Sequence, residues 1–210
     1  MGLRQQKKEQ TRQRLTETAW RLADERGFDR VTVAEIAQAA GVSEATLFNY
    51  FRTKEDLFYA PLETFGERLV EAVRSRAPGV SALAAVRDFL LGGDGLLAGP
   101  GEERQTRDRL RGQLRVITDS PALLAREQQA FAHYTEQLAA VLGESEETDP
   151  ITAAVVAHAL IGVHRSLVAH VRHRILAGAP LRRVAAEVRE HGDRAFGLLE
   201  DGLGRYGVAR

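Results

Sequence analysis

The sequence predicts an all-α fold of about nine helices, and three observations lead to this prediction. Apolar residues recur at intervals of three and four along nearly the whole chain, which is the period of an amphipathic helix. Short alternating runs of β-branched residues, which would indicate strands, are missing from the sequence. Several of the helical segments begin with proline and are followed by glycine, as helices in globular proteins often are.

Composition narrows the class of protein. The chain has 210 residues, of which 44% are hydrophobic and 28% charged, so it can bury a core without disulfides or metal. It contains no cysteine, which excludes thiol catalysis and Cys-ligated metal sites. The start of the chain is polar, and the longest low-charge run, 151–163, is shorter than the roughly 20 residues that span a bilayer. We therefore expect a cytoplasmic protein.

Local signals place the first two helices. A long helix is expected over 8–26, where Gly27 ends it. Thr32 and Glu35 have the spacing of a capping box, in which each side chain accepts a hydrogen bond from a free backbone N–H. This box predicts a short second helix over 33–40.

Further signals place the remaining helices. Gly41 is expected to end the second helix in the left-handed conformation, Ser43 to cap a third helix over 44–50, and Thr53 to cap a fourth. A Gly-rich linker is expected between 92 and 101. The later helices are expected over 80–91, 102–118, 121–143, 150–177 and 180–199.

Two short helices joined by a turn at Gly41, after a longer helix that can brace them, are the elements of a helix-turn-helix. An ordinary three-helix cluster without a role in DNA binding is the alternative. The third helix favours DNA binding because it has a polar face without acidic side chains, formed by Thr46, Asn49 and Tyr50. The expected core of this domain is Leu22, Phe28, Val33, Ile36, Ala37, Val42, Leu47 and Phe51.

Charge is unevenly distributed although the net charge is zero. Between Met1 and Arg14 five basic residues, among them Lys7 and Lys8, stand against the single acid Glu9. This excess predicts a basic N-terminal arm that adds affinity for DNA phosphates. A solvated polar tail is the alternative.

Four motifs in the first third of the chain resemble the signature of the TetR family of bacterial transcriptional regulators. They are AWRLADERGFD at 19–29, VTVAEIA at 31–37, AGVSEATLFNYF at 40–51 and KEDLF at 54–58. The resemblance is dense over residues 10–58. It implies a helix-turn-helix DNA-binding domain over 1–58 and a helical effector-binding and dimerisation domain over 59–210.

The resemblance also implies roles for single residues. The second helix would position the third, which would enter the major groove. Residues that would touch phosphates are Thr32, Thr46, Phe48, Tyr50 and Lys54, and those that would approach bases are Glu44, Ala45, Thr46 and Asn49. Phe48 departs from the tyrosine common in the family, so a hydroxyl contact is lost, although the ring can pack on a thymine methyl. Ala23 stands where the family often has a large aromatic, and Trp20 is expected to fill that space.

The resemblance further implies a homodimer that binds an operator in double-stranded DNA and responds to a small-molecule effector. Apolar stripes on the last two helices would form the dimer interface. On the earlier of the two helices the stripe is Ala153, Ala157, Leu160, Leu167, Val171 and Ile175, and on the later one it is Leu181, Val184, Val188, Ala195 and Leu199. Core packing inside one subunit is the alternative, and some of these residues must serve it. The candidate effector-binding residues are Phe65, Phe89, Arg107, Arg111, Leu114, Phe131, Tyr134, His158 and His164.

No cofactor and no metal are expected. His170 and His173 share a helix face, but arginines flank them and no carboxylate lies near them in the sequence. The function predicted is that of a DNA-binding regulator, a repressor released by a small molecule, and not of an enzyme. One alternative is an all-α enzyme that uses the C-terminal cavity, but the sequence contains no Ser-His-Asp or phosphate-loop pattern. The other alternative is a helical adaptor without a role in DNA binding.

Overall fold

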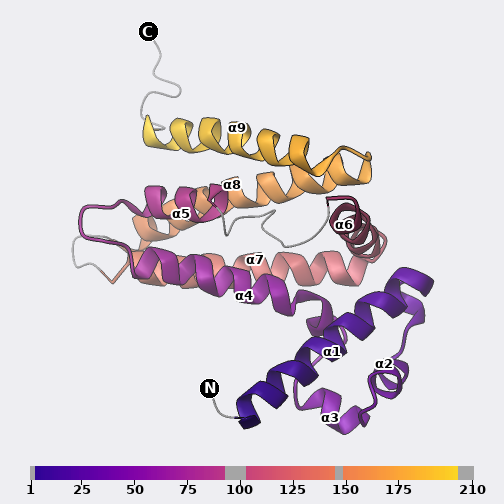
Figure 1. The fold of residues 1–210 in the computed structure, drawn as a ribbon. Helices are drawn as coiled ribbons and strands as arrows, with labels where there is room; N and C mark the ends of the chain where they lie inside the picture. The colour runs from indigo at the N-terminus through magenta and orange to yellow at the C-terminus, as the bar shows by residue number, and fades with distance from the viewer. Residues whose placement is uncertain (1–2, 93–102, 145–148, 203–210) are drawn as a thin grey trace. The chain divides into compact units, whose positions relative to one another are not determined.

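A computed structural model describes residues 3–92, 103–144 and 149–202, and this part of the chain is all-α, as predicted (Figure 1). The Gly-rich stretch expected to be a linker lies, except for Gly92, outside the described residues. The elements are α1 (Leu3–Arg26), the 3-10 turn η1 (Phe28–Arg30), α2 (Val33–Ala39), α3 (Glu44–Phe48), α4 (Asp56–Arg74), α5 (Ala82–Leu91), α6 (Glu103–Thr118), α7 (Pro121–Leu142), α8 (Pro150–Leu176) and α9 (Leu181–Glu200).

The chain packs as two compact units. The head unit comprises Met1–Glu63 and Arg111–Gln129, and the second unit comprises Thr64–Leu110 and Ala130–Arg210. The head unit thus contains the predicted DNA-binding domain together with parts of α6 and α7. The predicted domain boundary at residue 58 stays a prediction.

The first helix is longer than predicted. It begins at Leu3, so Lys7 and Lys8 lie inside α1 instead of preceding it. The expectation that these residues belong to an arm before the helix is therefore wrong for the described part of the chain. The reason is that residues 5–10 are all Gln, Lys or Glu, which are good helix formers, and that neither glycine nor proline interrupts them. The basic side chains consequently stand at fixed positions along a helix.

The predicted signals around α2 and α3 are confirmed. Thr32 and Glu35 form the reciprocal capping box at the start of α2, and Gly41 has a φ of 67°, the left-handed conformation that glycine adopts without strain. Ser43 caps α3 by accepting a hydrogen bond of 3.1 Å from the Thr46 N–H. Because each of these bonds connects close neighbours in sequence, local pattern alone could predict them.

The Thr32 cap is expected to stabilise the head unit measurably. Thr32→Ala removes the acceptor for the Glu35 N–H and should lower the free energy of unfolding by about 1 kcal/mol. Thr11→Ala is the matched control because the Thr11 hydroxyl only donates to a carbonyl within α1, that of Lys7. Urea unfolding followed by circular dichroism measures both variants, and equal midpoints would contradict the assignment of a stabilising cap.

Other bounds differ from the prediction by a few residues. The third helix ends at Phe48, where the sequence predicted residue 50, because Asn49 already serves as its C-cap. The 3-10 turn η1 was not predicted. Thr53 precedes α4 as predicted, and its hydroxyl accepts a hydrogen bond of 3.2 Å from the Asp56 N–H. The fifth helix begins at Ala82, and its N-cap Ser81 was not predicted.

The core of the head unit contains the residues expected there. Six of the eight predicted core residues are at most 7% exposed, and Val33 and Val42 are partly buried against them. Trp20 packs edge-on against Phe58 with ring centroids 4.8 Å apart, beside the buried Ala23. This packing agrees with the expectation that Trp20 is a core residue.

The second unit has its own core, in which α8 is the central helix. The α8 stripe that the sequence assigned to a dimer interface is buried within this unit, with all six of its residues at most 7% exposed. That part of the prediction is wrong because α4, α5, α7 and α9 provide apolar partners for α8 inside one chain.

Among the described helices α8 alone is long and apolar enough to cross a membrane, which differs from the sequence expectation. Its buried stripe, however, is that of a core helix.

Candidate nucleic-acid interface

Helix α3 presents one face to solvent and is anchored by the other. Glu44, Ala45, Phe48 and Asn49 are exposed, and their spacing places them along one side of the helix. Leu47 points the opposite way and is completely buried. The face that carries the residues predicted to approach bases is therefore accessible to a ligand.

Phe48 is the most unusual residue of this face. Its side chain is 50% exposed, which makes it one of the few large apolar residues on the surface of the described chain. Exposed aromatic rings cost free energy in water and are common where a protein binds a partner. In the major groove the C5-methyl of thymine offers an apolar contact for such a ring.

The threonines predicted to touch phosphates already make hydrogen bonds within the head unit. The Thr46 hydroxyl lies 2.8 Å from the Ser43 hydroxyl, and the Thr32 hydroxyl donates to the Glu35 carboxylate at 2.9 Å. Both hydroxyls are therefore oriented by the caps of α3 and α2. The Thr32 backbone N–H is the largest cause that lowers the pKa of Glu35, to about 2, so this carboxylate stays charged at neutral pH.

Lys54 is held by the head unit itself. Its ammonium donates to the carbonyl oxygens of Phe28 and Val31, each at 3.0 Å, and lies 3.9 Å from the centroid of the Phe28 ring. These contacts join the segment after α3 to η1. The lysine predicted to touch a phosphate thus has two of its three N–H groups occupied by backbone carbonyls.

Basic residues of α1 lie beside the end of α3. A groove of about 160 Å³ is lined by residues from both segments, namely Gln5, Lys8, Glu9, Arg12, Asn49 and Tyr50. Sequence reasoning assigned Lys8, Asn49 and Tyr50 to DNA binding, counted Arg12 only in the basic excess of residues 1–14, and missed Gln5. The spacing of four residues between Lys8 and Arg12 was the signal that could have placed them on one face of a helix. Lys7 is exposed and does not line this groove.

The start of α4 is tied to α7 by an ion pair that the sequence did not reveal. Arg126 Nε lies 3.0 Å from Asp56 Oδ1, and the Arg126 guanidinium also binds Glu63. Burial acts to lower the pKa of Arg126, but the hydrogen bonds to the two carboxylates outweigh it and the pKa lies above its ordinary value. Asp56 Oδ2 also accepts from the Thr53 N–H, so this network fixes the turn that follows α3.

The candidate effector-binding residues are only partly brought together. Five of them form an aromatic cluster in the second unit, with ring centroids 5.0 to 5.9 Å apart: Phe65, Phe89, Phe131, Tyr134 and His164. His158 is exposed on α8, and Arg107 is paired with Asp108. Arg111 and Leu114 belong to the head unit and not to the unit that holds the cluster.

His164 is the most perturbed group of the aromatic cluster. It is completely buried, and its Nδ1 lies 3.3 Å from the Tyr134 hydroxyl, whereas its Nε2 has no hydrogen-bond partner among the described residues. Burial lowers the pKa of His164 to about 4. The imidazole is therefore neutral at pH 7 and offers a single polar atom in an apolar environment.

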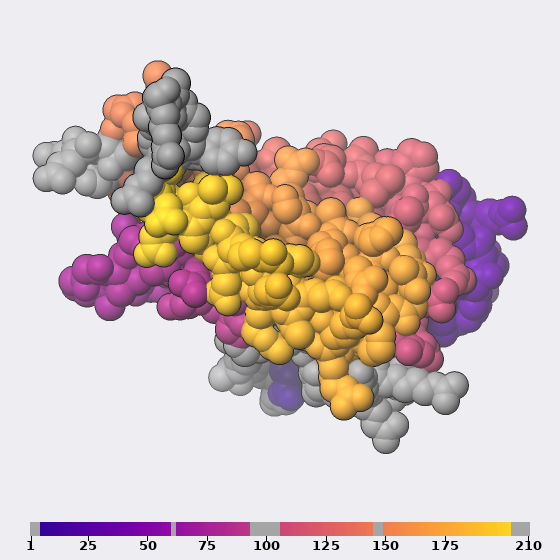
Figure 2. Space-filling model, turned by 90° about the horizontal axis from the view of Figure 1, so that it is seen from above, coloured from indigo at the N-terminus to yellow at the C-terminus, as the bar shows by residue number. Residues whose placement is uncertain are grey.

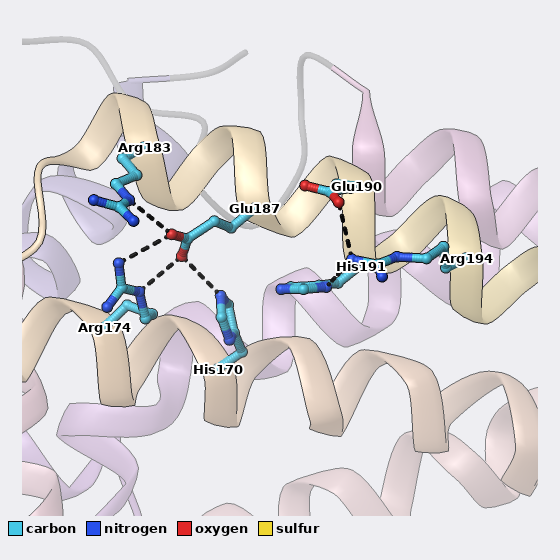
Figure 3. A network of polar contacts seen from close by, with 7 residues as sticks. All are labelled: His170, Arg174, Arg183, Glu187, Glu190, His191 and Arg194. Atoms are coloured by element: carbon cyan, nitrogen blue, oxygen red, sulfur yellow. Dashed lines mark hydrogen bonds and ion pairs between the residues drawn. The ribbon is translucent and has the colours of Figure 1, made fainter.

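Figure 3 shows a second polar network, between α8 and α9. Glu187 accepts from Arg174 at 2.8 Å and from Arg183 at 3.1 Å, and lies 3.1 Å from His170 Nε2. The hydrogen bond from Arg174 is the largest cause that lowers the pKa of Glu187 to about 2. The sequence expectation that no carboxylate lies near His170 is wrong, because α9 folds back along α8 and brings Glu187 to it.

A short, solvent-facing helix after a turn, braced by a longer helix, defines the head unit as a helix-turn-helix module. Residues 15–60 match the family model described as bacterial regulatory proteins of the TetR family. This match covers the helix-turn-helix and identifies a DNA-binding domain of the TetR type in the head unit, the type found in a family of bacterial transcriptional regulators.

The chain is similar to proteins known as regulators. It is 28% identical over 149 residues to the HTH-type transcriptional regulator TcmR of Streptomyces glaucescens, which covers 70% of this chain and 66% of the relative. It is 38% identical over 81 residues to the fatty acid metabolism regulator protein of Bacillus subtilis, covering 35% and 42% of the two chains. The aligned segments thus span less than two thirds of these curated relatives.

Similarity of fold extends over most of the chain. A crystal structure of NalD, the secondary repressor of the MexAB-OprM multidrug efflux pump in Pseudomonas aeruginosa, matches with a TM-score of 0.55. The match covers 89% of this chain and 97% of NalD at 19% sequence identity. At this identity the match concerns the fold alone.

Proposed function

We propose that this chain is a DNA-binding transcriptional regulator, a repressor that binds a palindromic operator as a homodimer in the cytoplasm and is released by a small molecule. The observation that carries the proposal is the exposed face of α3, with Phe48 half exposed and Leu47 anchored beneath it. A rigidly held helix with an accessible polar and aromatic face is what major-groove recognition requires. The match of residues 15–60 to the TetR family model supports the same function.

Dimerisation is proposed through α8 and α9. Figure 2 shows α9 and part of α8 lying open on one face of the molecule. Ile151 and Val155, one turn apart at the start of α8, are 77% and 58% exposed, and Leu198 of α9 is 48% exposed. A second copy would remove these apolar side chains from water. They replace the buried α8 stripe as the candidate interface residues.

The effector site is proposed within the aromatic cluster of the second unit. Its rings offer apolar contacts, and the unpaired Nε2 of His164 offers one hydrogen bond to a ligand. In this structure the cluster is closely packed: a Cβ added at Gly66 would lie 2.5 Å from the Tyr134 ring. A ligand would therefore have to move these rings, which is one physical way for its binding to change the conformation of the unit.

The proposal is tested with the purified chain and the DNA upstream of its own gene. We expect a gel shift on this DNA that a scrambled duplex of the same length and composition does not give at the same salt concentration. DNase footprinting should show two protected half-sites whose centres lie about 34–36 Å apart, or a multiple of this. Equal affinity for both duplexes would contradict sequence-specific regulation, and a single asymmetric half-site would contradict the dimer.

Phe48→Ala should weaken binding to the operator by about 1–3 kcal/mol, because an apolar contact to a base is lost. Binding to the scrambled duplex should change little, since non-specific binding depends on phosphates. Fluorescence anisotropy measures both affinities. Val80→Ala is the control, since Val80 is also an exposed apolar residue but lies in the second unit. Equal losses on both duplexes would remove Phe48 from the base-reading face.

A further inference from the structure

The groove between α1 and the end of α3 has the composition of an anion site. Four of its six lining residues carry N–H donors in their side chains, and two of these, Lys8 and Arg12, are cations. The Tyr50 hydroxyl adds a fifth donor. Glu9 is the one acid on its wall, so the cations outnumber the acids there.

The two cations of this groove have no carboxylate partner among the described residues. Arg12 also lines a larger neighbouring groove, whose carboxylates are those of Glu55, Asp56 and Glu63. Arg126 binds Asp56 and Glu63, and Glu55 forms no ion pair with Arg12 among the described residues. The charge of Arg12 is therefore available to an external anion.

Arg12 is also held in place before any ligand arrives. Its guanidinium carbon lies 5.6 Å from the centroid of the Phe51 ring, and Phe51 is only 3% exposed. An arginine stacked near a fixed aromatic face loses less side-chain freedom when it binds an anion. Lys8 lies one turn earlier on the same helix, so both cations approach the groove from one side.

We propose that this groove binds one backbone phosphate of duplex DNA, with Arg12 as its central cation and Lys8, Tyr50 and Asn49 as further donors. The inference deepens the proposed function and rests on it. The groove borders the C-terminal end of α3, where the strand that flanks an occupied major groove would pass. Asn49 then contacts the backbone instead of a base.

The same inference changes the role of Lys54. Because its ammonium binds the Phe28 and Val31 carbonyls, Lys54 fixes the segment after α3 against η1 and is a positioning residue. The electrostatic anchoring that the resemblance implies for Lys54 belongs to Arg12 and Lys8. The distinction is measurable because phosphate contacts set the dependence of affinity on salt.

The test measures DNA affinity of the full chain from about 50 to 200 mM salt for wild type, Arg12→Gln, Lys8→Gln and Lys54→Gln. We expect Arg12→Gln to reduce the slope of log affinity against log salt by about 0.9 for each subunit bound, equally on operator and scrambled DNA. Arg12→Lys, which keeps the charge, should restore most of the slope. Lys54→Gln should lower the melting temperature and leave the slope unchanged.

Arg14→Gln is the matched control, because Arg14 lies on the same helix, exposed and outside the groove. An unchanged slope in Arg12→Gln, or an equal change in Arg14→Gln, would overturn the phosphate site while leaving the proposed function intact. A wild-type chain that binds no DNA would overturn the proposed function and this inference with it. A third outcome is that inorganic phosphate at constant ionic strength stabilises the DNA-free chain, and that Arg12→Gln loses this stabilisation without any change in the salt slope. That outcome would identify a site for free anions and would also overturn the proposed DNA phosphate site.

Discussion

Lowering the pH from 6.5 to 4 is expected to destabilise the second unit by roughly 3 kcal/mol, because His164 is buried as a neutral imidazole. Burial lowers the pKa of His164 to about 4 in the folded chain, against 6.5 for an exposed histidine. Between these values the unfolded chain binds a proton that the folded chain does not. The stability that His164 contributes is thus fully present above pH 6.5 and is lost as the pH falls towards 4.

The surroundings of His164 explain why protonation is unfavourable. Phe65 and Phe131 flank the imidazole with ring centroids 5.2 and 5.4 Å away, and the Tyr134 hydroxyl is the polar group in contact with it. No carboxylate is paired with His164 among the described residues, so a positive charge there would be buried without compensation.

Urea unfolding at intervals between pH 7 and 5 tests this prediction, because above pH 5 the carboxylates contribute little to the slope. His164→Asn should remove a slope of up to about 1.4 kcal/mol per pH unit, whereas His158→Gln, an exposed histidine on the same helix, should keep it. Parallel stability curves for wild type and His164→Asn would contradict the burial of a neutral histidine.

The parts of the fold that could be predicted from the sequence are those specified by neighbours. The bonds of Thr32 with Glu35 and of Ser43 with Thr46 span three residues, and the turn at Gly41 requires a conformation that glycine favours. These signals place α2 and α3, and with them the exposed face that carries the predicted base contacts. Pattern also predicted that Leu47 is buried beneath that face.

The parts that could not be predicted depend on residues far apart in the sequence. The Lys54 ammonium binds carbonyls 23 and 26 residues earlier, and Arg126 binds Asp56 across 70 residues. Nothing local distinguishes such a cation from one that is free to bind a phosphate. For the same reason Arg12 could not be recognised as available before Asp56 and Glu63 were seen to be bound by Arg126.

Leu47→Ala is expected to lower the free energy of unfolding of the head unit by about 2–5 kcal/mol. Helix α3 has only five residues, too few to be stable by itself, so its position depends on tertiary packing. Leu47 is completely buried and is the one residue of α3 in the core of the head unit. Its truncation leaves a cavity beneath the helix and removes the contact that holds the recognition face.

Two variants at neighbouring positions separate anchoring from DNA contact. Leu47→Met nearly conserves volume and should cost less than about 1.5 kcal/mol. Phe48→Ala removes a larger side chain from the same helix, but its ring is already half exposed, so it should change stability less than Leu47→Ala while still weakening operator binding. Chemical unfolding and operator affinity are measured for all three variants. A Leu47→Ala chain as stable as the Phe48→Ala chain would show that α3 is held in place by contacts other than Leu47.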